Sequence, residues 1–67
     1  MQVKSDNTAE RIAYTPAGAA MASGRSRTRI FGAIKRGELR ARKDGRATLI
    51  EHEELCRWIR SLPVKAA

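Results

Sequence analysis

The side chains best suited to chemistry in this 67-residue chain are arginines and lysines, and they gather in one stretch. Residues 25–46 hold nine basic side chains and two acidic ones, whereas the rest of the chain holds five of each. The whole net charge of +7 therefore belongs to these 22 residues. Guanidinium and ammonium groups bind phosphate oxygens, and the planar guanidinium also matches the acceptor atoms of guanine. The pattern predicts a surface that binds a polyanion.

Residues suited to catalysis or metal binding are sparse. One cysteine, Cys56, and one histidine, His52, cannot complete a four-ligand zinc site or an internal disulfide. The sequence has no Ser-His-Asp order and no glycine-rich phosphate loop. Glu53 and Glu54 are adjacent in a predicted helix and point about 100° apart, so they do not form a carboxylate pair. We expect His52 to be a surface residue at a helix start without a chemical role. We also expect no enzymatic activity, cofactor or metal.

The length of the chain limits it to one small domain. No run approaches the roughly 18 apolar residues that cross a bilayer, and the first residues lack the apolar core of a secretory signal. We expect a flexible N-terminal arm over residues 1–11, a folded domain over residues 12–63 and a C-terminal tail over residues 64–67. The expected location is the bacterial cytoplasm.

Two short helices are predicted in the first half of the chain. Thr15 before a proline is typical of a helix start, and an alanine-rich helix follows. A turn follows in which Gly24 can take a positive φ, and Ser26 then resembles a second N-cap. A helix over residues 27–36 would then place Ile30, Phe31 and Ile34 on its buried face.

A β-hairpin is predicted next, because Asp44 and Gly45 form a dipeptide that favours tight turns between strands. If these two residues make the loop, Leu39 pairs with Ile50 on the inner face and Leu49 points outward. Either the turn is then not a simple two-residue one, or Leu49 packs under the N-terminal arm or a partner.

A final helix over residues 51–62 is the clearest element, because Leu55, Trp58, Ile59 and Leu62 form one apolar stripe. The predicted fold is mainly α with a small β-hairpin, in the order α-α-β-β-α.

An ordered set of short motifs runs through residues 14–62. Its members are Thr15-Pro16-Ala17-Gly18-Ala19-Ala20, Gly24-Arg25-Ser26-Arg27, Ile30-Phe31, Ile34-Lys35-Arg36-Gly37-Glu38-Leu39-Arg40-Ala41, Gly45-Arg46, Ile50 and Leu55-Cys56-Arg57-Trp58-Ile59. In this set the chain resembles the small winged helix-turn-helix domains of excisionase and AlpA-type regulators, relatives of the MerR-type DNA-binding domain. The resemblance implies sequence-specific binding of duplex DNA, with helix 27–36 in the major groove and a wing at residues 40–48 on the backbone or in the minor groove.

The chain departs from the family at several positions. The family usually has glutamate where Gly18 stands, and a threonine or similar residue is common at Arg29. It often has tyrosine at Phe31, whose hydroxyl can reach a phosphate. A phenylalanine makes no such bond, so we assign Phe31 to packing only.

Charge and resemblance together predict two groups of DNA-binding residues. On the recognition helix they are Ser26, Arg27, Thr28, Arg29, Gly32, Lys35 and Arg36. On the wing they are Arg40, Arg42, Lys43 and Arg46. Gly32 is included because a glycine facing outward would let the helix backbone approach base edges closely.

The expected function is that of a transcriptional regulator or an excisionase-type recombination directionality factor, associated with the nucleoid when bound. Its partners would be double-stranded DNA and, for cooperative binding, a second copy or another DNA-bound protein. No membrane or small-molecule substrate is expected. Two alternatives stay open: a non-catalytic adaptor for an acidic protein, and a binder of structured RNA. Of the three aromatic residues only Phe31 lies within the basic stretch, and so few aromatic rings disfavour RNA binding by base stacking.

Overall fold

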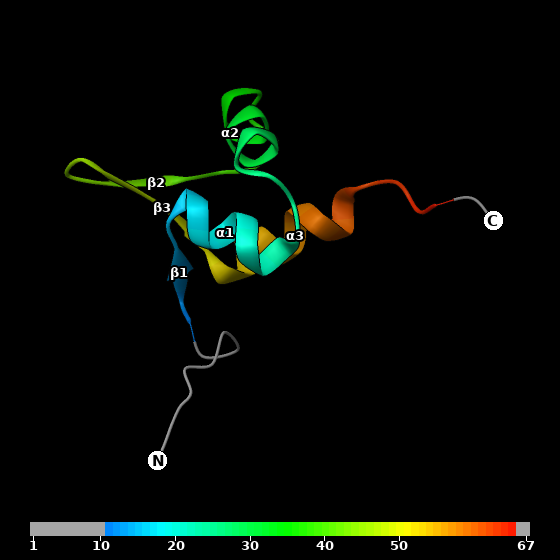
Figure 1. Cartoon of the computed structure of the whole chain (residues 1–67), viewed down its shortest axis with the longest axis horizontal. Helices are drawn as coiled ribbons and strands as arrows, with labels where there is room; N and C mark the ends of the chain where they lie inside the picture. Colours follow the sequence, from blue (N-terminus) through cyan, green and yellow to red (C-terminus); the bar gives the residue numbers. More distant parts are fainter. Residues whose placement is uncertain (1–10, 66–67) are drawn as a thin grey trace, which may run out of the picture.

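The computed structural model describes residues 11–65 and contains three helices and a three-stranded antiparallel sheet (Figure 1). In chain order the elements are β1 (Ala13–Tyr14), α1 (Pro16–Ser23), α2 (Arg27–Lys35), β2 (Arg42–Asp44), β3 (Ala47–Glu51) and α3 (His52–Ser61). Residues 1–10 of the predicted arm and the last two residues of the predicted tail lie outside the described residues. Within residues 11–65, no helix has the length and apolarity needed to cross a membrane.

The first two helices begin at the residues that the sequence predicts. The Thr15 hydroxyl accepts a hydrogen bond from the Gly18 amide at 3.0 Å, and the Ser26 hydroxyl accepts one from the Arg29 amide at 3.1 Å. Between the helices, Gly24 has a φ of +75°, a left-handed conformation that favours glycine. These contacts satisfy amides that the first turn of a helix otherwise leaves unpaired.

The hairpin has a different register from the predicted one. Arg42 pairs with Leu49 and Asp44 with Ala47, so the loop consists of Gly45 and the residue after it. The predicted pairing of Leu39 with Ile50 is therefore wrong by two residues. The positive φ of Gly45, +61°, falls at the first loop position, where one of the two favoured hairpin turns takes glycine.

A third strand, β1, was not predicted. It lies beside β3, with Ala13 opposite Glu51 and Tyr14 opposite Ile50, and gives the sheet the order β1-β3-β2. The element order is thus β-α-α-β-β-α rather than α-α-β-β-α. Leu49, which the predicted register turned outward, is half-buried and lines a cavity with residues of β1 and α1.

The core lies where α1, α2 and α3 meet the sheet. Its largest fully buried side chains, each less than 2% exposed, are Trp58, Ile30, Leu39 and Ile50. Along α3, Leu55 and Trp58 are buried as the apolar stripe predicts, whereas Ile59 is 36% exposed. One indole thus fills the centre of a domain whose first helix contributes only Ala19 and Ala20 as buried residues.

Candidate nucleic-acid interface

The exposed face of α2 is opposite the buried pair Ile30 and Ala33, both 0% exposed. At 100° per residue, the exposed side chains fall within one arc of about 100° on the helix. These side chains are Arg27, Thr28, Phe31 and Lys35. The arc contains two cations and no acid, a composition suited to a negatively charged partner.

The prediction that Phe31 packs in the core is wrong, because the side chain is 49% exposed. The buried face of α2 runs through Ile30 and Ala33, while Ile34 lies at its margin. That placement turns the aromatic ring toward the exposed arc. Ala33 could have located the buried face of α2 correctly. An alanine is easily overlooked in a pattern of hydrophobic residues, because its side chain is small.

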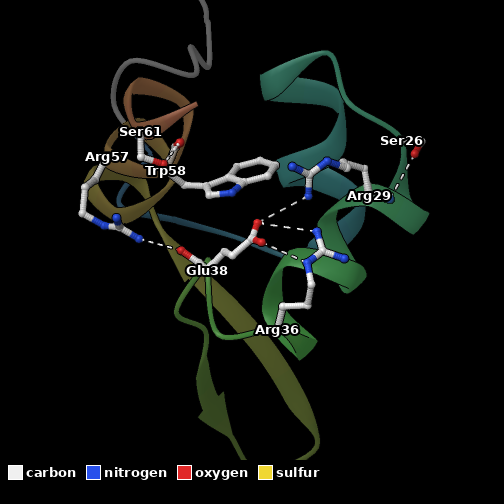
Figure 2. A network of polar contacts seen from close by, with 7 residues as sticks. All are labelled: Ser26, Arg29, Arg36, Glu38, Arg57, Trp58 and Ser61. Atoms are coloured by element: carbon white, nitrogen blue, oxygen red, sulfur yellow. Dashed lines mark hydrogen bonds and ion pairs between the residues drawn. The ribbon is translucent and has the colours of Figure 1, made fainter. Parts of the chain in front are cut away.

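Two predicted DNA-binding arginines, Arg29 and Arg36, turn toward the carboxylate of Glu38 (Figure 2). Arg36 donates from Nε to Oε2 at 2.9 Å and from its second terminal nitrogen to Oε1 at 3.5 Å. The Nη1 atom of Arg29 lies 3.8 Å from Oε1 of Glu38, and the guanidinium carbon of Arg29 is 5.0 Å from the centroid of the Trp58 ring. Both side chains therefore have partners within the chain.

The same contacts set the charge state of this group. Hydrogen bonding from Arg36 is the largest cause that lowers the pKa of Glu38 below its usual value, and the reciprocal contact raises the pKa of Arg36. The Trp58 indole nitrogen is buried and has no hydrogen bond of standard geometry within the described residues. Its N–H is nevertheless close enough to Glu38 to contribute to the lowered pKa of that carboxyl. Glu38 is thus held as an anion beside two cations.

Gly32 lies on the flank of α2 rather than in the exposed arc. A Cβ atom at this position would be 3.2 Å from a terminal nitrogen of Arg36. The Arg36 side chain, which extends to Glu38, therefore occupies the space beside Gly32. Gly32 therefore has a neighbour within the chain, the Arg36 side chain, as well as the DNA that we predict would approach it.

The β2–β3 hairpin carries the predicted wing residues, and their surroundings differ. Arg42 forms an ion pair with Glu51 at 3.2 Å, across the hairpin. Arg40, Lys43 and Arg46 are exposed. Within residues 11–65, Lys43 and Arg46 form no ion pair, so the cations nearest the loop are available to a partner.

The segment that leads from α2 into β2 is fastened to α3 by Glu54 and Arg57. The Glu54 carboxylate accepts hydrogen bonds from Arg57 at 2.9 and 2.6 Å and from the Arg40 amide at 2.9 Å. Arg57 also donates to the Glu38 carbonyl oxygen at 2.8 Å. The hydrogen bonds from Arg57 are the largest cause that lowers the pKa of Glu54 to about 2. This bridge fixes where the hairpin leaves the helical part of the protein.

The exposed cations of residues 25–46 that form no ion pair within the described residues define a basic surface. Its members are Arg25, Arg27, Lys35, Arg40, Lys43 and Arg46. They come from the α1–α2 turn, from α2, from the segment that leads into β2 and from the hairpin. In Figure 1, α2 lies at the top and the hairpin projects to the left beneath it, whereas β1 and α3 lie lower in the view.

His52 is not the simple surface residue that the sequence predicts. It is half-buried, its Nδ1 lies 2.9 Å from the Tyr14 hydroxyl, and its Nε2 lies 3.6 Å from the sulfur of Cys56. Its amide donates to the Ile12 carbonyl oxygen at 2.9 Å. These contacts fasten β1 to the start of α3. Within the described residues, no group of three potential ligands could hold a metal ion.

A scan of protein-family models, a search of curated proteins and a search of solved structures each found no match to this chain.

Proposed function

We propose that this chain is a winged helix-turn-helix protein that binds duplex DNA sequence-specifically. It would act as a transcriptional regulator or as an excisionase-type recombination directionality factor. In this proposal, α1 and α2 are the helix-turn-helix and the β2–β3 hairpin is the wing. The observation that carries the proposal is the basic surface: six exposed cations without an ion pair, on the turn, α2, the segment before β2 and the hairpin, in a chain that is otherwise close to neutral.

The dimensions of α2 suit the major groove. A helix with its side chains is about 10–12 Å wide, and the groove of B-DNA is about 12 Å wide. The nine residues of α2 span roughly 13 Å, which corresponds to about four base pairs. The exposed arc would face the base edges, and the amides at the start of α2 would lie near a phosphate.

So short a reading helix supplies limited specificity by itself. We therefore propose that the protein binds repeated sites, together with a second copy or another DNA-bound protein. The wing, through Lys43 and Arg46, would contact the backbone or the minor groove and fix the register on the duplex. The proposed setting is the bacterial cytoplasm, with the protein on the nucleoid when bound.

The test is binding of the full chain to random-sequence duplex DNA over a series of salt concentrations. About five phosphate contacts predict a slope near −4.5 in a plot of log affinity against log salt. The absence of measurable binding at about 50 mM salt, where such contacts are strong, would contradict the proposal.

Two competitors separate the proposal from its alternatives. An RNA hairpin that displaced duplex DNA at lower concentration would favour a function in RNA binding. An acidic protein that bound the chain while duplex DNA did not would favour an adaptor. We expect duplex DNA to compete best, because the basic surface has no exposed aromatic platform beyond Phe31 among the described residues.

A further inference from the structure

Phe31 occupies an unusual place for a large apolar side chain. It is 49% exposed and lies four residues from Arg27 on one side and four from Lys35 on the other. Residues four apart are neighbours along one face of a helix. The ring is therefore in the middle of the cationic arc of α2, between two cations that form no ion pair within residues 11–65.

The burial around α2 explains why the ring is left outside. Ile30 and Ala33 fill the buried face completely, and both are 0% exposed. Other large apolar side chains are exposed in the described part of the chain, but none of them lies on α2. These residues are Ile12, Met21, Ile59 and Val64. Phe31 is thus the one apolar group that α2 would carry into a DNA groove.

We propose that the Phe31 ring contacts the C5 methyl group of a thymine in the major groove and so specifies that base. The inference rests on the proposed function. The thymine methyl is the apolar group that base pairs present in the major groove, and apolar side chains recognise it by contact. Phenylalanine has no donor or acceptor, so it recognises no other feature of a base edge. Arg27 and Lys35 would bind phosphate or guanine on either side of it.

The test uses a duplex obtained by selection from a random library with the full chain. Each thymine of that duplex is replaced in turn by deoxyuridine, which removes the methyl group and leaves base pairing unchanged. At one or two positions we expect the wild-type affinity to fall about fourfold, the effect of removing one buried methyl group. The Phe31→Ala protein should bind the thymine and deoxyuridine duplexes equally well.

Two further variants make the result specific to this side chain. Phe31→Leu keeps an apolar contact and should retain part of the preference for thymine. Met21→Ala removes an apolar side chain that is 87% exposed on α1, and it should retain the full preference. Circular dichroism of each variant checks that it is folded.

The outcomes separate the inference from the proposed function. If the wild-type protein binds duplex DNA but no deoxyuridine substitution weakens it, the contact is absent and the inference fails while DNA binding stands. An equal loss in wild type and Phe31→Ala would also overturn it, since another residue would then touch the methyl group. If no duplex is bound at all, both the proposed function and the inference fail.

Discussion

At the scale of single residues, Glu38 decides what two arginines of the basic stretch can do. Its carboxylate is the partner of both Arg36 and Arg29, and its lowered pKa keeps it ionised. A DNA phosphate that reached either guanidinium would have to compete with this internal anion. The cost of that competition should oppose binding to any sequence equally.

Removing the internal anion should therefore strengthen non-specific binding. For Glu38→Gln we expect the affinity for random duplex DNA at low salt to rise severalfold. We also expect the salt slope to steepen by about 1 for each phosphate that a released arginine contacts. The measurement is a fluorescence titration over several salt concentrations.

The matched control for that variant is Glu53→Gln, which removes the same charge from an exposed position in the first turn of α3. Glu53 forms no ion pair within the described residues. If both variants changed affinity and slope equally, the effect would be one of net charge, and the competition ascribed to Glu38 would be wrong.

Two glycines should respond to alanine in opposite ways. A Cβ on Gly32 meets only the flexible end of Arg36, so Gly32→Ala should raise the free energy of unfolding by up to about 1 kcal/mol through better helix propensity. Gly24 has a φ of +75°, and Gly24→Ala should lower that free energy by about 1 kcal/mol.

Urea denaturation measures the free energy of unfolding of both variants and so tests the two expected changes. A destabilised Gly32→Ala would show that Arg36 cannot move aside. If Gly32→Ala is stabilised but loses DNA affinity, the predicted close approach of DNA to Gly32 is supported.

At the scale of elements, the hairpin depends on a polar bridge as well as on strand pairing. Glu54 and Arg57 on α3 hold the Arg40 amide and the Glu38 carbonyl, so they position the segment that enters β2. A hairpin held in this way keeps a fixed position relative to α2 and α3. The bridge also makes stability depend on pH.

The direction of that dependence follows from the pKa of Glu54, which is about 2 in the folded protein against an ordinary value of 4.5. The ionised Glu54 stabilises the folded protein fully when the pH is above the ordinary pKa of 4.5. This stabilisation is lost as the pH falls from about 4.5 through about 2. We expect a loss of about 1–2 kcal/mol in the free energy of unfolding over this range, allowing for solvent screening.

Glu54→Gln should reduce this acid-dependent loss and lower stability at neutral pH. Denaturation at a series of pH values measures both effects, with Glu53→Gln as the control. The lowered pKa of Glu38 acts in the same direction, so part of the pH dependence should persist in Glu54→Gln. An unchanged pH profile would show that the bridge does not contribute to stability.

At the scale of the whole molecule, the distribution of charge matters more than its sum. The net charge of +7 lies in residues 25–46, and folding leaves six of the nine cations there without an ion pair in the described structure. Others, including Arg42 and Arg36, are paired with acids of the chain. The proposed function therefore predicts that removing one positive charge weakens DNA binding more at some positions than at others.

Lys43 and Arg60 offer a direct comparison, because both are exposed cations but only Lys43 belongs to the basic surface. Lys43→Ala should weaken binding to specific and random duplexes alike and should make the salt slope shallower by about 0.9, the value for one phosphate contact. Arg60→Ala, on α3, should change the slope little. Equal changes in slope would indicate that DNA does not contact the hairpin preferentially.

The sequence by itself determined the features that depend on neighbouring residues. The N-caps at Thr15 and Ser26, the left-handed turn at Gly24 and the burial of Trp58 were all predicted, because each follows from local chemistry or from one strong apolar stripe. The location of the net charge in residues 25–46 could also be found from the sequence, since it requires only counting along the chain.

Only the tertiary structure decided which side chains of the basic stretch face outward. Phe31 is exposed because Ala33, rather than a larger residue, meets the core, and Arg29 turns inward because Trp58 and Glu38 lie beside it. The pairing of β1 with β3 and the contact of Tyr14 with His52 at the start of α3 likewise join residues nearly 40 positions apart. Local patterns carry no information on such distant partners, and packing selects among the faces that a short helix could bury.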